Sequence, residues 1–177
     1  MGDIREPIPA LLVIPAFSGL PQAMALAREK AILDFGPLLR ESEVMPFDCT
    51  AYYADEMGPD LRLVIWAFER RVPPGELAAI KHRTNAIEAE AAAEGGFPVP
   101  RPVNLDPGLL SLDKLALATT KSRSHRLHIG GGIYAESTLR HHGSSYVPWP
   151  WTYPSYQRAG VLEFFNRLRE DVLKQKG

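Results

Sequence analysis

The sequence of 177 residues is poor in cysteine, with Cys49 as its single thiol. One thiol cannot form an intramolecular disulfide, and the sequence has no Cys-x-x-Cys pair and no Cys/His spacing typical of zinc sites. Disulfides belong to oxidising compartments, so their exclusion favours the cytoplasm. His128, His141 and His142 have no carboxylate or thiol at a supporting spacing. The sequence therefore predicts no metal site and no other cofactor.

Long hydrophobic runs are also missing. The apolar stretch from Ala10 to Leu20 is interrupted by Pro15, is much shorter than the ~20 residues that cross a bilayer, and follows an acidic start. We therefore expect no transmembrane helix, no signal peptide and no membrane partner. Glu6 stands where N-myristoylation requires Ser or Thr. The phosphate-binding loop GxxxxGK[ST] is absent too.

Neither sign of charge predominates. The chain has 20 Lys and Arg against 21 Asp and Glu, a net charge of -1. Binding of nucleic acid by bulk electrostatics usually requires a clearly basic domain, so the composition argues against nucleic acid as a partner, although a local basic patch is compatible with it. The hydrophobic content of 45% is ordinary for a soluble globular protein. The length fits a single domain spanning residues 1–177.

Hydrophobic patterning over the first 105 residues predicts four strands and two helices. The expected strands cover residues 10–14, 43–47, 61–71 and 103–105. Apolar stripes at helical spacing predict one helix from Pro21 to a stop at Gly36-Pro37 and a second from Pro73-Pro74 to Gly95-Gly96. The solvated side of the second helix is expected to carry Glu76, Lys81, Arg83, Glu88 and Glu90.

This order of elements predicts a ferredoxin-like βαββαβ core, with an antiparallel sheet and both helices on one face. A second β region follows. Residues 115–119 are predicted as a strand, with the end of a short helix from Ser111 as the alternative, and residues 145–147 as another strand. An apolar stripe beginning at Ala159 predicts a C-terminal helix. The predicted fold class is α+β: the ferredoxin-like core, extended by an antiparallel β-meander, plus that helix.

The segment from Lys121 to Glu136 is the most polar and the most constrained part of the chain. Its polar and apolar residues alternate on both sides of a glycine triplet, which predicts a β-hairpin. The three glycines supply the positive φ that a tight turn demands. Cross-strand pairing would gather cations and a carboxylate on one face, which is expected to carry Arg126, His128, Tyr134 and Glu136.

Five segments together resemble the DUF4416 family of bacterial and archaeal proteins. They are PFDCTAYYADEMG (46–58), IKHRTNAIE (80–88), VNLDPGLLSLDKLALATTK (103–121), SHRLHIGGGIYAESTL (124–139) and WTYP (151–154). The family is defined by sequence, so the resemblance implies positions of interest and no activity. Leu109 stands where many relatives are expected to have an aromatic residue, which argues against stacking there. The positions implied are Asp48, Thr50, Tyr52, Tyr53, Glu56, Asn104, Asp106, Lys121, His125, Arg126, Tyr134 and Glu136.

Each group of candidate residues has a structural alternative. The polar loop around Asp48 and Glu56 is a wall of a ligand site, or a loop held by its own side-chain turns. Asn104 and Asp106 point into a cleft, or form an ordinary Asp-Pro turn. The basic residues of the hairpin bind an anion, or form a solvated face paired with Glu136.

The aromatic segment, residues 148–156, has two interpretations of its own. Its tryptophans and tyrosines alternate with prolines. They either cover the open end of the sheet as core or offer stacking surfaces to a base or a protein partner. The prolines fix the path without any ligand, which favours the first.

These observations predict a cytoplasmic protein that binds a small anionic ligand, phosphate-bearing or nucleotide-like. The expected site lies between the basic hairpin and the loop around Asp48 and Glu56. If the protein is an enzyme, His125 or Glu136 is the general acid or base, and Lys121 with Arg126 holds the anion. Two alternatives remain open: a non-catalytic RNA- or nucleotide-binding module, and an interaction or homo-oligomerisation module without a small ligand.

Overall fold

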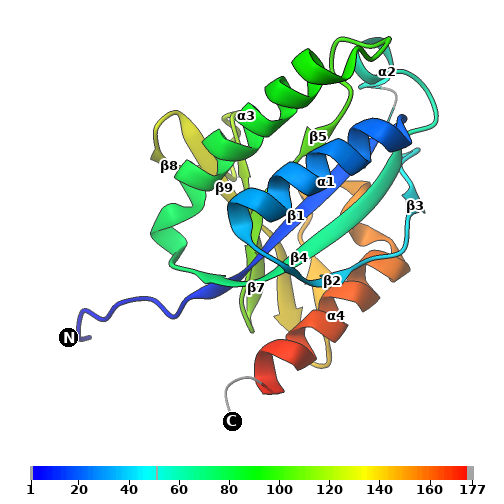
Figure 1. Cartoon of the computed structure of the whole chain (residues 1–177). Coiled ribbons are helices and arrows are strands. Elements are labelled where there is room, and N and C mark those ends of the chain that lie inside the picture. Colours follow the sequence, from blue (N-terminus) through cyan, green and yellow to red (C-terminus); the bar gives the residue numbers. More distant parts are fainter. Residues whose placement is uncertain (1, 51, 175–177) are drawn as a thin grey trace.

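The computed structural model of the protein describes residues 2–50 and 52–174 (Figure 1). Its strands are β1 (Ala10–Ser18), β2 (Leu38–Glu41), β3 (Met45–Pro46), β4 (Arg62–Val72), β5 (Asn104–Leu105), β6 (Gly108–Leu110), β7 (Lys114–Thr119), β8 (Leu127–Gly130), β9 (Ile133–His142) and β10 (Ser145–Pro148). Its helices are α1 (Pro21–Phe35), α2 (Ala54–Met57), α3 (Leu77–Gly95) and α4 (Ala159–Lys174), with 3-10 turns η1 (Pro74–Glu76) and η2 (Pro154–Gln157).

All strands belong to one open antiparallel sheet in the order β10-β9-β7-β6-β1-β4-β2. Three short strands pair outside this path: β3 with β4, β5 with β1, and β8 with β9. The α+β class and the C-terminal helix that the sequence predicts are confirmed. Within residues 2–50 and 52–174, every helix is too short or too polar to cross a bilayer.

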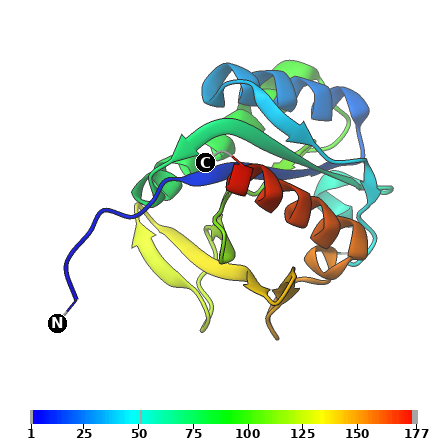
Figure 2. The same cartoon turned by 90° about the horizontal axis from the view of Figure 1, so that it is seen from below.

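Strand β1 is the centre of the sheet, because it is buried along its whole length. Successive side chains of a strand point to opposite faces. Leu12 and Ile14 pack in the cluster formed with α1 and α3, whereas Leu11 and Val13 pack in the cluster formed with α4. Figure 2 shows α1 above the sheet and α4 below it. A strand covered on both faces has the continuous apolar sequence seen here.

Pro15 lies inside this central strand, although proline lacks the N–H that a sheet interior normally uses. The reason is a break between β5 and β6 on that side of β1. The carbonyl of Pro15 accepts a hydrogen bond from the N–H of Asp106, which lies between the two strands. Because the N–H and C=O of one strand residue point to the same side, the missing donor faces this break. The strand therefore continues to Ser18.

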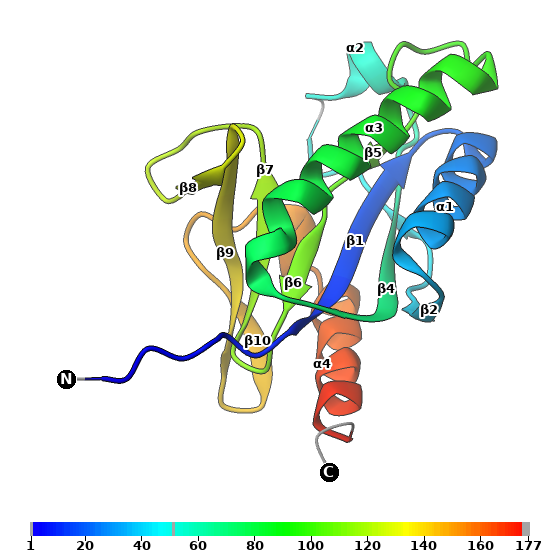
Figure 3. The same cartoon turned by 60° about the vertical axis from the view of Figure 1, so that its left-hand side comes forward.

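The glycine hairpin forms as predicted. Strands β8 and β9 pair in an antiparallel manner, and Gly130, Gly131 and Gly132 have φ angles of 106°, 57° and 76°. The carbonyl of Gly131 lies 2.8 Å from Nε2 of His82, so the turn contacts α3. Residues 114–119 form strand β7, which excludes the alternative helix. Figure 3 shows β7 and β9 side by side beneath α3.

Some short elements differ from prediction. Strand β2 follows α1 almost directly and pairs with β4, where no element was expected. Of the strand expected at residues 43–47, only the two residues of β3 are in strand conformation. The predicted turn at Gly108 instead begins β6, paired with β1 and β7. These elements are short edge or bridging strands, and pairing with a long neighbour rather than their own sequence stabilises them.

We predict that Gly108→Ala destabilises the fold. A Cβ at this position would lie 2.7 Å from the carbonyl oxygen of Ala116, in backbone that cannot move aside easily. The expected loss is about 1–3 kcal/mol in the free energy of unfolding, measured by urea denaturation. The matched control is Gly75→Ala, where a Cβ meets nothing within 4 Å. An equal loss in both variants would contradict the prediction.

Candidate functional site

Two adjoining cavities open between α3, the aromatic segment and the loop that follows β3. The first, which we call the aromatic cavity, has a volume of about 430 Å³. Its walls include six aromatic rings: Phe17, Phe47, Tyr52, Tyr53, Tyr153 and Tyr156.

The second, the polar cavity, has a volume of about 310 Å³. Helix α3 lines it with Lys81, Asn85 and Glu88. Both cavities are lined by Asp106 and Lys121. The two therefore adjoin, and we call them together the cleft, with aromatic walls on one side and charged walls on the other.

The aromatic cavity is built on the end of β1. The ring of Phe47 stacks on Phe17 with centroids 4.2 Å apart, and Tyr53 meets Phe17 edge-on at 4.9 Å. These contacts attach the loop after β3 to the sheet. Burial raises the pKa of Tyr53 to about 12, and the nearby Asp106 carboxylate adds to the shift. Tyr53 therefore presents a neutral phenol to the cleft at physiological pH.

Two cations stand at the mouth of the aromatic cavity. Nζ of Lys121 lies 4.5 Å from the ring centroid of Tyr52 and 3.3 Å from its hydroxyl. Arg123 is exposed and lines the same cavity. Among residues 2–50 and 52–174, neither has a carboxylate within 4.0 Å. Both are available to an anion.

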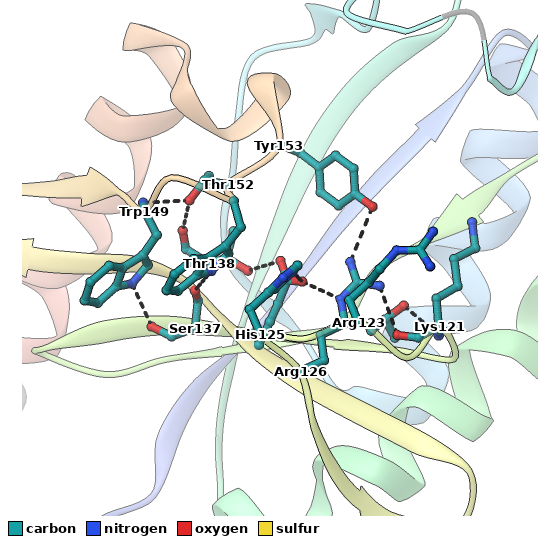
Figure 4. A network of polar contacts seen from close by, with 12 residues as sticks. Lys121, Arg123, His125, Arg126, Ser137, Thr138, Trp149, Thr152 and Tyr153 are labelled. Carbon is teal, nitrogen blue, oxygen red and sulfur yellow. Dashed lines mark hydrogen bonds and ion pairs between the residues drawn. The ribbon is translucent and has the colours of Figure 1, made fainter.

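Arg126, by contrast, is fully engaged. Its Nε donates to Glu136 at 2.7 Å, and each of these side chains is only 3% exposed. The two other guanidinium nitrogens donate to the carbonyl of Lys121 at 3.0 Å and to the hydroxyl of Tyr153 at 3.3 Å (Figure 4). Glu136 also accepts from Thr138 and lies 3.2 Å from Nε2 of His125. This buried pair positions the hairpin against the aromatic segment.

The aromatic segment and His125 form a continuous stack. His125 lies on Trp151 at 5.4 Å, Trp151 on Trp149 at 5.1 Å, and the guanidinium of Arg140 lies 4.5 Å from the ring of Trp149. Both indole N–H groups donate to Ser137. Both tryptophan side chains are thus tied to β9, although Trp151 remains 37% exposed.

Helix α3 supplies charged partners to the open edge of β5. The N–H of Leu105 donates to Glu88 at 2.7 Å, and Lys81 donates to the carbonyl of Leu105 at 2.7 Å. Arg101 donates to both Glu88 and Asn104. Asn104 donates to Asp106 at 2.9 Å, and Asp106 lies 3.5 Å from Nζ of Lys81. A closed ring of polar contacts results.

Most of the residues suggested by the sequence meet in the cleft. The aromatic cavity is lined by Thr50, Tyr52, Tyr53, Asp106 and Lys121, and the polar cavity by Asn104, Arg126 and Glu136 as well.

Four suggested residues line neither cavity. Asp48 forms an ion pair with Arg158, and Glu56 lies 3.6 Å from Arg101. His125 stacks on Trp151, and Tyr134 lies beside His128 with ring centroids 5.3 Å apart. The loop after β3 thus contributes its tyrosines to the cleft rather than its carboxylates.

Two cleft residues lie elsewhere than the sequence predicts. Lys81 and Glu88 were expected on the solvated side of their helix, but Lys81 is 4% exposed and both line the polar cavity. Asn85 and Arg101 were not singled out, and Tyr153 was considered only as part of the aromatic segment. A usable signal exists, since Lys81, Asn85 and Glu88 recur at i, i+4 and i+7 and so share one helix face.

The part of the chain that the structure describes contains no group of three or more His, Cys, Asp or Glu side chains arranged as metal ligands.

Comparison with known proteins identifies one family. A model described as a domain of unknown function, DUF4416, matches residues 8–171. No curated protein and no solved structure matches the chain.

The buried ion pair yields a stability prediction. Arg126→Met leaves Glu136 charged and buried without its main partner, which costs about 3–5 kcal/mol in the free energy of unfolding. The control is Arg123→Met, an exposed site in the same segment, where the change should stay within about 0.5 kcal/mol. Urea denaturation measures both, and similar values for the two variants would refute a structural role for Arg126.

We predict that two glutamates of α3 have pKa values shifted in opposite directions from the ordinary value of 4.5. Burial raises the pKa of Glu88, whereas hydrogen bonds from Arg83 and Lys30 lower that of Glu90. The folded chain then holds the Glu88 proton to higher pH than the unfolded chain. Its contribution to stability is complete below pH 4.5 and is lost as pH rises through the raised pKa. A carbon-13 NMR titration, with Glu88→Gln for assignment, would reject this if Glu88 titrated at or below 4.5.

Proposed function

The chain belongs to the DUF4416 family, and from the cleft we propose that it binds a small anionic, phosphate-bearing ligand. The phosphate lies on Lys121 and Arg123, and the rest of the ligand lies against the aromatic walls. The observation that carries this proposal is the pair of cations without carboxylate partners, within the described residues, at the mouth of the aromatic cavity. Lysine and arginine are the usual partners of phosphate, and clefts lined by aromatic rings with a few polar groups are the usual sites of small ligands.

This assignment shifts the anion site within the basic hairpin. Arg126 was expected to hold the anion beside Lys121, but its guanidinium already donates to Glu136, Lys121 and Tyr153. Arg123 takes its place, because it reaches the cavity and has no carboxylate within ion-pair distance in the described chain. For the same reason we propose a binding role and assign no acid-base role to His125, which lies outside both cavities.

The alternative of RNA binding by base stacking finds less support. A base would stack on an open aromatic face. His125, the two tryptophans and Arg140 already stack on one another.

The fold supports a compact frame for this site. We propose that β6, β1, β4 and β2, adjacent in that order and with α1 and α3 on one face, are a ferredoxin-like core that carries the cleft. The cytoplasm, favoured by the single cysteine, is the compartment we propose.

A thermal-shift panel tests the proposed function. Sugar phosphates, nucleotides, short RNAs and divalent metals are added to the wild-type chain. A phosphate-bearing ligand at about 100 times its Kd should add about 2.7 kcal/mol to the free energy of unfolding, a shift of several degrees for a chain of this size.

The double variant Lys121→Met/Arg123→Met should lose this shift. Its control is Arg167→Met, which removes an exposed cation on α4 that lines neither cavity, and should respond as the wild type does. If every phosphate compound leaves the wild type unchanged, or if the double variant still responds, the proposed function is wrong.

A further inference from the structure

Asp106 stands where the two cavities join. Among the residues that the structure describes, it is the carboxylate that lines both of them. Its side chain is 32% exposed, so a ligand in the cleft can reach it. The two other carboxylates of the polar cavity, Glu88 and Glu136, are 13% and 3% exposed.

The less exposed carboxylates also use more of their hydrogen-bonding capacity. A carboxylate offers about four acceptor positions. Glu88 uses its two oxygens on the N–H of Leu105 and on Arg101, and Glu136 accepts from Arg126 and Thr138 and lies beside His125.

Within the described residues, the carboxylate of Asp106 accepts one hydrogen bond, from Asn104, and makes one longer ion pair, with Lys81 at 3.5 Å. Acceptor capacity is therefore left over, and the exposed part of the side chain faces the cleft.

A carboxylate in an anion-binding cleft weakens the binding of a simple anion. It repels a bare phosphate held on Lys121, because like charges disfavour binding. The same carboxylate favours a ligand that brings a hydrogen-bond donor to it, since a charge-assisted hydrogen bond is stronger than a neutral one. The combination of two cations with one accessible carboxylate therefore selects a molecule that carries an anion and donors together.

The aromatic walls narrow the chemical class of the ligand further. Tyr53 and Tyr153 line both cavities with aromatic rings that carry polar hydroxyl tips. Such walls fit a compound with carbon-bound hydrogens on its faces and hydroxyls at its edge.

On the basis of the proposed function, we propose that the ligand is a phosphate monoester of a sugar or other polyol. Its hydroxyls donate to Asp106, while its phosphate binds Lys121 and Arg123. Asp106 is thus a specificity-determining residue, which distinguishes this ligand from simpler phosphates.

The test is isothermal titration calorimetry on the full chain with three probes: ribose 5-phosphate, methyl phosphate and phosphoethanolamine. Wild type should bind ribose 5-phosphate at least about tenfold more tightly than methyl phosphate, because a site built to bond hydroxyls rejects analogues that lack them. Phosphoethanolamine replaces the hydroxyls by an amine and should bind more weakly than ribose 5-phosphate.

Asp106→Asn should remove the preference for ribose 5-phosphate over methyl phosphate. The variant loses about tenfold in affinity for ribose 5-phosphate, while methyl phosphate binds as well as before or better, since the repelling charge is gone. Asp113→Asn removes an exposed carboxylate outside the cleft and is the matched control, expected to behave as wild type. The comparison of probes on wild type decides the question even if Asp106→Asn folds poorly.

The outcomes separate the two proposals. If wild type binds ribose 5-phosphate and methyl phosphate equally, or phosphoethanolamine best, the polyol assignment is wrong while the phosphate site stands. If Asp106→Asn changes both affinities in the same direction and to the same extent, Asp106 does not contact hydroxyls. If neither phosphate binds wild type, both proposals fail together.

Discussion

Two backbone groups at the open edge of β5 determine how the cleft is built. The N–H and C=O of Leu105 point away from β1 and are buried, and a buried backbone group without a partner is costly. No neighbouring strand reaches them, so Glu88 and Lys81 of α3 supply the partners. Two charged side chains therefore point inward from a helix whose other buried residues are apolar apart from Thr84.

This capping of β5 has a consequence for the chemistry. A buried charge must itself be compensated. Arg101 donates a hydrogen bond to Glu88, and Asp106 forms an ion pair with Lys81. Asn104 links the two pairs, because it accepts from Arg101 and donates to Asp106. The polar cavity is thus the outer side of a structural network. Asp106, its most exposed carboxylate, is where that network meets the aromatic cavity.

The sequence predicted the local features well and the pairing of charges poorly. Strand β1 and the glycine hairpin were predictable, because a continuous apolar run and a glycine turn are set by their own residues. A helical stripe, however, separates apolar from polar positions and cannot show that Lys81 points inward. Likewise, counting cations in the hairpin could not show that Arg126 is neutralised while Arg123 is not. Those distinctions depend on which side chains meet once the elements have packed together.

The aromatic walls tie ligand binding to stability. Phe17, Phe47 and Tyr156 are buried core residues, yet each also lines the aromatic cavity. Removing any of them would create a cavity and lower stability, whatever it did to a ligand. Loss of binding in such a variant would not identify a contact. Lys121 and Arg123 differ, because both are exposed and neither supports the core. The function of this cleft is therefore best examined through its two cations and Asp106, where recognition can be altered while the fold is kept.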